Sequence, residues 1–272
     1  MCDEFGCGIK TSDKPLPKIT DMDRRQFSLG LATLSLATIL AYPDLVRAAG
    51  HMVKEFSIDT PSGHKAMGAY AKAHGDKAPA ILLIHEWWGL NDQIKSVAHS
   101  LSEMGYNVLA IDLYDGQYGS TREEAMALMK GLDPKAATEK LVSAINWLRA
   151  NGSGKVATMG WCFGGGWSLN ASLATPVDGT IIYYGNVKKS ADDLASLSSP
   201  VLGHFGTLDK RINKVMVDGF EASLKAAGKT DFKNHWYEAD HAFANPTGAR
   251  YDEADAVLSW ERTIAFLKKH LM

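Results

Sequence analysis

The chain has 272 residues, of which 46% are hydrophobic and 22% are charged, and its formal net charge is −2. A chain of this size and composition can bury a substantial core, and its charge does not point to a nucleic-acid partner. No GxxxxGK[ST] phosphate loop and no GxGxxG fingerprint occurs, so a bound nucleotide is not indicated. No HExxH motif and no clustered Cys/His spacing occurs either, so we expect neither a metal nor a cofactor.

The first fifty residues carry a pattern that differs from the rest of the chain. Arg24 and Arg25 precede Phe27, and residues 29–42 then form an uncharged stretch rich in Leu, Ala and Thr. This stretch is shorter than the roughly 20 apolar residues that a membrane-spanning helix needs. The arrangement resembles a twin-arginine export signal.

The residues that follow predict where such a signal ends. Val46 and Ala48 supply the small side chains that a signal peptidase needs. We therefore expect residues 1–48 to be a leader with a twin-arginine-type signal peptide, and residues 49–272 to be the mature domain. The resemblance implies the twin-arginine translocase as a partner during export and a periplasmic location. Two alternatives stay open: Met22 is the true start, or the segment is retained as an amphipathic helix or an anchor.

The three cysteines divide between these two parts of the chain. Cys2 and Cys7 belong to the leader, so Cys162 has no disulfide partner within residues 49–272. A lone thiol in an oxidising compartment is a liability unless it is buried or used in chemistry. Cys162 is therefore a candidate reactive residue.

From about residue 53 onwards, strand and helix patterns alternate. Alternating or continuous apolar runs predict strands, and amphipathic periodicity with capping residues predicts helices. The expected strands are 53–59 and 67–73 (an antiparallel pair), 79–85, 106–114, 155–160, 179–185, 200–206 and 232–238, and the expected helices are 91–105, 121–131, 134–151, 165–174, 213–228 and 249–270. Strands that alternate with helices in this way indicate one three-layer α/β domain with a mostly parallel sheet.

Ligands of such a sheet bind at the carboxyl ends of its strands, so reactive residues should follow strands. Cys162 lies in Gly160-Trp161-Cys162-Phe163-Gly164, between a predicted strand and a predicted helix, which is the context of a nucleophile elbow. Glycines at 160 and 164 relieve the crowding of that strained turn. The turn places the sulfur at a helix N-terminus, which favours a thiolate, and aims the Phe163 N–H at an oxyanion. The alternative is a small core cysteine beside a helix-packing turn.

Two further residues follow later strands. Asp209 comes shortly after the strand 200–206, where a carboxylate can orient an imidazole, although it could instead cap the next helix near Asn213. His241 lies just beyond the last strand. The order nucleophile, acid, histidine is that of α/β-hydrolases. His85 also ends a strand, but it precedes the nucleophile, and we expect it to brace the adjacent loop.

Six sequence motifs together resemble the dienelactone hydrolase family of the α/β-hydrolase superfamily. They are HEWWGLND, IDLY, GWCFGGG, YYG, GTLD and HWYEADHAFA, and the resemblance covers essentially all of residues 49–272. The cysteine elbow is specific, because most of the superfamily uses serine. The resemblance implies the α/β-hydrolase fold, with Cys162 as nucleophile, His241 as general base and Asp209 as the residue that orients it.

The resemblance also implies roles for residues around this triad. Trp87 supplies a second oxyanion N–H beside that of Phe163. Glu86 matches a family glutamate that lies near the resting thiol and helps to govern its ionisation, although the alternative is a solvated loop carboxylate.

The chain departs from the family at two positions. The family's founding enzymes bind a substrate carboxylate with two arginines, and Gly116 and Asn245 stand in their places here. Arg122 and Arg250 are nearby in the sequence but do not match those positions. Dienelactone itself is therefore not carried over as the natural substrate.

We expect a cysteine-nucleophile hydrolase of lactones or activated carboxylic esters that acts through a thioester acyl-enzyme. Its partner would be a small ester or lactone, without nucleic acid, and its state a monomer or small homo-oligomer. One alternative is a catalytically silent binding protein of the same fold. Another is a thiol redox sensor, although residues 49–272 contain no second cysteine to resolve a sulfenic acid.

Overall fold

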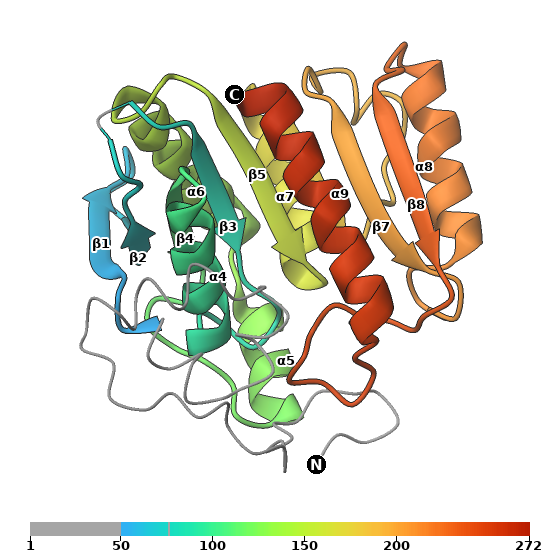
Figure 1. Cartoon of the computed structure of the whole chain (residues 1–272), viewed down its shortest axis with the longest axis horizontal. Helices are drawn as coiled ribbons and strands as arrows, with labels where there is room; N and C mark the ends of the chain where they lie inside the picture. The colour runs from blue at the N-terminus through green and yellow to red at the C-terminus, as the bar shows by residue number, and fades with distance from the viewer. Residues whose placement is uncertain (1–49, 76) are drawn as a thin grey trace.

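A computed structural model describes residues 50–75 and 77–272. The leader, signal and cleavage point expected over residues 1–48 lie outside the described residues. In the described part, eight strands form one sheet in the order β1-β2-β4-β3-β5-β6-β7-β8 (Figure 1). The strands are β1 Lys54–Asp59, β2 Lys65–Ala71, β3 Ala80–Ile84, β4 Asn107–Asp112, β5 Val156–Trp161, β6 Gly179–Tyr183, β7 Val201–Gly206 and β8 Phe232–Tyr237. The helices are α4 Asp92–Glu103, α5 Arg122–Gly131, α6 Pro134–Ala150, α7 Phe163–Ala174, α8 Lys214–Ala226 and α9 Glu253–Leu271.

The sheet is mostly parallel, as the alternating pattern predicted. β1 pairs antiparallel with β2, and β2 pairs antiparallel with β4, whereas the other neighbouring strands are parallel. Every residue of β3, β4, β5, β6 and β7 is buried. These strands read as continuous apolar runs because helices cover them on both faces.

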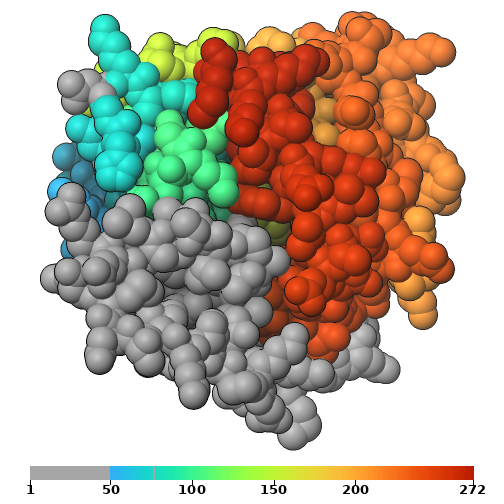
Figure 2. Space-filling view, viewed as in Figure 1, coloured from blue at the N-terminus to red at the C-terminus, as the bar shows by residue number. Residues whose placement is uncertain are grey.

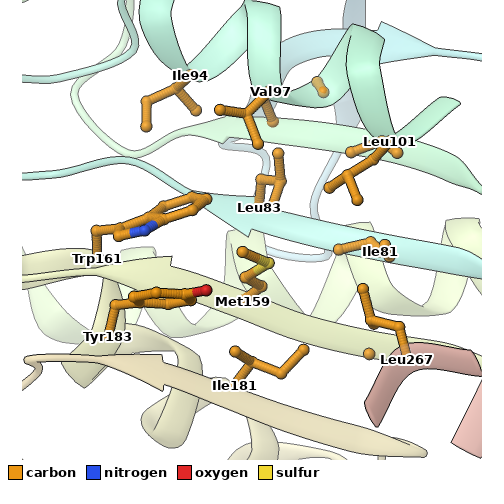
Figure 3. Close-up of a cluster of buried hydrophobic side chains, with 14 of the residues drawn as sticks. Ile81, Leu83, Ile94, Val97, Leu101, Met159, Trp161, Ile181, Tyr183 and Leu267 are labelled. Carbon is orange, nitrogen blue, oxygen red and sulfur yellow. The ribbon is translucent and has the colours of Figure 1, made fainter. Parts of the chain in front are cut away.

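The two faces of the sheet pack against different helices. Ile81 and Leu83 of β3 belong to one hydrophobic cluster with side chains of α4 and α9, as Figure 3 shows. Leu82 and Ile84 point to the other face and pack with α6. A third cluster, on the far half of the sheet, includes Ile182 of β6 together with side chains of α7 and α8. Figure 2 shows the face covered by α9, in red, beside α4, in green. The expected three-layer α/β architecture is confirmed.

The strand order predicts that the functional site lies at the carboxyl ends of the strands. β4 lies on one side of β3 and β5 lies on the other, so the connections after β3 and β5 diverge to opposite sides. Such a switch point opens a crevice outside the carboxyl ends of the strands. Figure 1 shows α5 at this end of the molecule, beyond the arrowheads of the strands.

The predicted start of the last helix was wrong by a few residues. The expected range began at residue 249, whereas α9 begins at Glu253, because the side chain of Asp252 accepts a hydrogen bond from Asp255 N–H and caps the helix there. Residues 242–251 form turns instead, and several of them line the cavities beside the sheet edge. Within the described part of the chain, no helix has the length and apolar character required to cross a bilayer.

Candidate active site

The turn between β5 and α7 holds Cys162 in a conformation that side chains rarely adopt. Cys162 has φ 54° and ψ −115° and directly precedes α7. A Cβ added to Gly160 would collide with the carbonyl oxygen of Gly164, and one added to Gly164 would collide with that of Ile84 at the end of β3. The predicted strand–turn–helix geometry is therefore present. It costs of order 1–3 kcal/mol of backbone strain, which the surrounding packing holds in place.

Cys162, His241 and Asp209 come together in one hydrogen-bonded row. His241 Nε2 lies 3.1 Å from Cys162 Sγ, and His241 Nδ1 lies 2.6 Å from Asp209 Oδ2. The other carboxylate oxygen of Asp209 accepts from the backbone N–H groups of Arg211 and Ile212 at 2.8 and 3.0 Å. Asp209 thus orients His241 and also closes its own loop, while Asn213 caps α8. The row has the mutual geometry of a nucleophile, a base and an orienting acid.

Electrostatics in this row favour a charged imidazole. Burial of His241 opposes a positive charge, but the attraction of Cys162 and the hydrogen bond to Asp209 outweigh it and raise the pKa of His241 to about 10. Burial also acts to raise the pKa of Asp209, but its hydrogen bond to His241 and the N–H groups of Arg211 and Ile212 hold that pKa below its usual value. A positively charged imidazole therefore lies 3.1 Å from the sulfur.

The expected oxyanion donors are the backbone N–H groups of Phe163 and Trp87. Phe163 is the first residue of α7, so its N–H has no acceptor within the helix. Trp87 lies in a turn that is closed by a 3.2 Å hydrogen bond from Gly89 N–H to the Glu86 carbonyl. Trp87, Phe163 and Cys162 line the same cavity, whose volume is about 790 Å³. When a sulfur adds to a carbonyl carbon, the carbonyl oxygen becomes an oxyanion. These two N–H groups are candidate donors to that oxygen.

Glu86 is buried beside the triad, but its hydrogen bond goes to Asn245. Its side-chain Oε2 accepts from Asn245 Nδ2 at 2.7 Å, and both residues are nearly inaccessible to solvent. Thr247 donates to Asn245 Oδ1 from both its N–H and its hydroxyl, which fixes the orientation of the amide. Burial raises the pKa of Glu86 to about 7, although the charge of His241, the Asn245 amide and Arg250 oppose the rise. The sequence identified Asn245 only as the place of a missing arginine, and gave no signal for this contact.

The structure gives a physical reason for the other departure from the family. Gly116 has φ 85° in an exposed turn, and its N–H donates to Asp112 Oδ2. Only glycine adopts this backbone conformation readily, so an arginine would be strained here. Arg122 and Arg250, by contrast, both line the cavity that contains Cys162.

Aromatic and basic side chains both line the cavity. Its apolar lining includes Trp167 of α7 and two methionines of α5, together with Trp87 and Phe163. Basic side chains come from the connections after β6 and β7, namely Lys188, Lys189, Lys210 and Arg211. No sequence pattern pointed to these basic residues, since lysines in loops have no distinguishing pattern. No group of three or more His, Cys, Asp or Glu side chains suited to a metal occurs among residues 50–75 and 77–272.

Known proteins resemble the chain in sequence and in fold. It is 29% identical over 236 residues to a carboxymethylenebutenolidase of Pseudomonas putida, covering 79% of this chain and 96% of that protein. It is 28% identical over 213 residues to carboxymethylenebutenolidase 1 of Cupriavidus pinatubonensis, covering 74% of this chain and 90% of the relative. A solved dienelactone hydrolase-like promiscuous phosphotriesterase from metagenomic libraries superimposes with a TM-score of 0.72 at 21% identity, covering 81% of this chain and 100% of that chain.

A family model also matches most of the chain. The model of the dienelactone hydrolase family matches residues 66–271, which includes every strand from β3 to β8 and the elbow at Cys162. The chain therefore belongs to the dienelactone hydrolase family, and it is a hydrolase with the α/β-hydrolase fold.

Proposed function

We propose that this protein hydrolyses lactones or activated carboxylic esters, with the Cys162 thiolate as nucleophile. The observation that carries the proposal is the row of Cys162 Sγ, His241 and Asp209, with separations of 3.1 and 2.6 Å, at the N-terminus of α7. The relatives named carboxymethylenebutenolidase support a lactone as the substrate class.

In the acylation step, the sulfur forms a bond to the substrate carbonyl carbon, and the carbonyl π electrons move to oxygen. The N–H groups of Phe163 and Trp87 stabilise that oxyanion, and removing one such donor typically costs about 2.7–4 kcal/mol in the barrier. The tetrahedral intermediate collapses, the C–O bond to the leaving oxygen breaks, and that oxygen takes a proton from the His241 imidazolium. A thioester on Cys162 and neutral His241 remain.

In the second step, His241 acts as general base for water. Water adds to the thioester carbonyl while His241 Nε2 takes its proton, and Asp209 stabilises the imidazolium that forms. The second oxyanion collapses with cleavage of the C–S bond, which regenerates the thiolate facing the imidazolium. Because thiolate is itself a good leaving group, substrates with a poor leaving alkoxide return to starting material. Activated esters and strained lactones are therefore favoured.

We propose further that residues 1–48 are an export leader and that the hydrolase acts in the periplasm. Arg24-Arg25, Phe27 and the short apolar stretch over residues 29–42 support this. N-terminal sequencing of the protein recovered from a periplasmic fraction should begin at Ala49. Recovery of full-length protein in the cytoplasm of a cell with an active twin-arginine translocase would contradict the proposal.

The catalytic roles predict the behaviour of two substitutions. With activated aryl esters and unsaturated lactones, Cys162→Ala and His241→Ala should each lower kcat/KM by at least about 10³-fold, because the nucleophile or its base is lost. Steady-state rates on the purified folded variants measure this, with Val215→Ala on the exposed face of α8 as a matched control that keeps wild-type rates. Turnover that survives Cys162→Ala would refute the assignment of the nucleophile.

The raised pKa of Glu86 predicts that the free energy of unfolding depends on pH. Its pKa is about 7 in the folded protein and near 4.5 in the unfolded chain, so the folded state holds its proton more tightly. The stability that this proton provides is fully present below pH 4.5 and is lost as the pH rises through 7. Glu86→Gln has no such loss, so it should exceed the wild type in unfolding free energy by about 2–3 kcal/mol at pH 8 and by little at pH 4.5.

Urea unfolding of both proteins at pH 4.5, 6 and 8 makes this measurement. Glu221→Gln on the exposed face of α8 is the matched control, and it should show no comparable pH-dependent difference. A Glu86→Gln variant whose stability relative to wild type is the same at all three pH values would contradict the buried, proton-holding state of Glu86.

A further inference from the structure

We propose that His85 is a positioning residue that aims the Trp87 N–H at the oxyanion. It would do so by fixing the peptide group between Glu86 and Trp87. The inference rests on the proposed function, because the oxyanion exists only if Cys162 attacks a carbonyl. It adds a residue outside the row of Cys162, His241 and Asp209, and it concerns the geometry of the donor rather than the nucleophile.

The hydrogen bonds of His85 determine which ring nitrogen carries the proton. Leu113 N–H donates to His85 Nε2 at 3.1 Å, so Nε2 is the unprotonated nitrogen. Nδ1 lies 2.6 Å from the Glu86 carbonyl oxygen, which can only accept, so Nδ1 carries the hydrogen and donates it. The side chain is fully buried, and burial lowers the pKa of His85 despite the Glu86 carbonyl and the nearby Asp112 carboxylate. The ring is therefore a neutral bridge between the end of β4 and the turn after β3.

The carbonyl that receives this hydrogen bond belongs to the same peptide group as the Trp87 N–H. In a planar trans peptide the C=O and N–H point in opposite directions. The Glu86 carbonyl is held from one side by His85 Nδ1–H and by Gly89 N–H, at 2.6 and 3.2 Å. Rotating this peptide would break both bonds. In the described part of the chain, the Trp87 N–H donates to no backbone carbonyl, which leaves it available to a substrate oxygen.

The same histidine also contacts the other donor residue. The His85 ring stacks on the Phe163 ring, with centroids 5.8 Å apart and planes inclined by 15°. Tyr114 packs on His85 at 4.8 Å between centroids. Gly164 approaches the His85 carbonyl so closely that a Cβ would collide with it. The buried His85 side chain therefore contacts both the turn that carries the Trp87 N–H and the elbow that carries the Phe163 N–H.

The test compares binding of an oxyanion with ordinary binding in the full-length protein. An aryl trifluoromethyl ketone adds the Cys162 sulfur to its carbonyl carbon and forms a tetrahedral oxyanion, whereas the matching aryl amide binds without this addition. His85→Leu removes the Nδ1–H donor at similar volume. It should weaken inhibition by the ketone and lower kcat/KM by about 100- to 1,000-fold, with the affinity for the amide within about threefold of wild type.

Two controls separate positioning from a general structural role. His85→Asn places an amide N–H near the position of Nδ1 and should recover most of the lost ketone affinity. His204 is likewise buried, but its hydrogen bonds go to Tyr237 and Thr263 rather than to the peptide group that carries the Trp87 N–H. His204→Leu should lower the melting temperature and leave the ratio of ketone to amide affinity at its wild-type value.

A measurement on the unsubstituted protein keeps the proposal testable if His85→Leu does not fold. Long-range ¹H–¹⁵N spectra of histidine-labelled protein should show the His85 proton on Nδ1, and a proton on Nε2 would overturn the proposal. A folded His85→Leu variant that binds ketone and amide in the wild-type ratio would overturn it as well. If wild type forms no adduct with the ketone, the proposed nucleophile fails and this inference fails with it. If wild type forms the adduct and His85→Leu keeps the wild-type ratio of ketone to amide affinity, only the role of His85 is contradicted.

Discussion

The strained turn at Cys162 is the constraint on which the rest of the site depends. A cysteine with φ 54° persists only where packing holds it, and here two glycines let the turn press against its own helix and the end of β3. Because Gly164 touches the backbone of Ile84 and His85, the elbow and the loop after β3 are positioned as one unit. The sulfur, the helix N-terminus and the two proposed oxyanion donors therefore keep a common geometry that depends on the centre of the sheet.

Burial and charge oppose each other throughout this site, and specific partners decide the outcome. His241 and Asp209 are removed from water, yet each is stabilised in its charged form by the neighbours in its row. Glu86 accepts a hydrogen bond from the neutral Asn245 amide, and burial prevails there, so its pKa rises to about 7. A buried carboxylate beside the triad is thus a group whose charge changes near neutral pH. In the proposed mechanism, an ionised Glu86 favours the imidazolium form of His241 through space.

Local patterns predicted the sheet and most of the site, because their causes are local. Continuous apolar runs indicate buried parallel strands, and the glycines around Cys162 satisfy a steric need within one turn. The Glu86–Asn245 hydrogen bond joins residues 159 positions apart, and no local pattern records it. The predicted start of α9 was wrong because Asp252, rather than an earlier residue, supplies the capping carboxylate. The sequence predicted only that His85 braces the adjacent loop, and the two hydrogen bonds of its ring are seen only in the structure.

The central claim is that catalysis passes through a thioester on Cys162. Full-length protein would be mixed with an activated aryl ester, quenched in acid within milliseconds to seconds, and examined by intact mass and peptide mapping. We expect one acyl group per chain, located on the peptide that contains Cys162, which forms with the burst of aryl alcohol and disappears as acid product is released. Turnover with no acyl group on that peptide at any time, or with the acyl group on another residue, would contradict a thioester on Cys162.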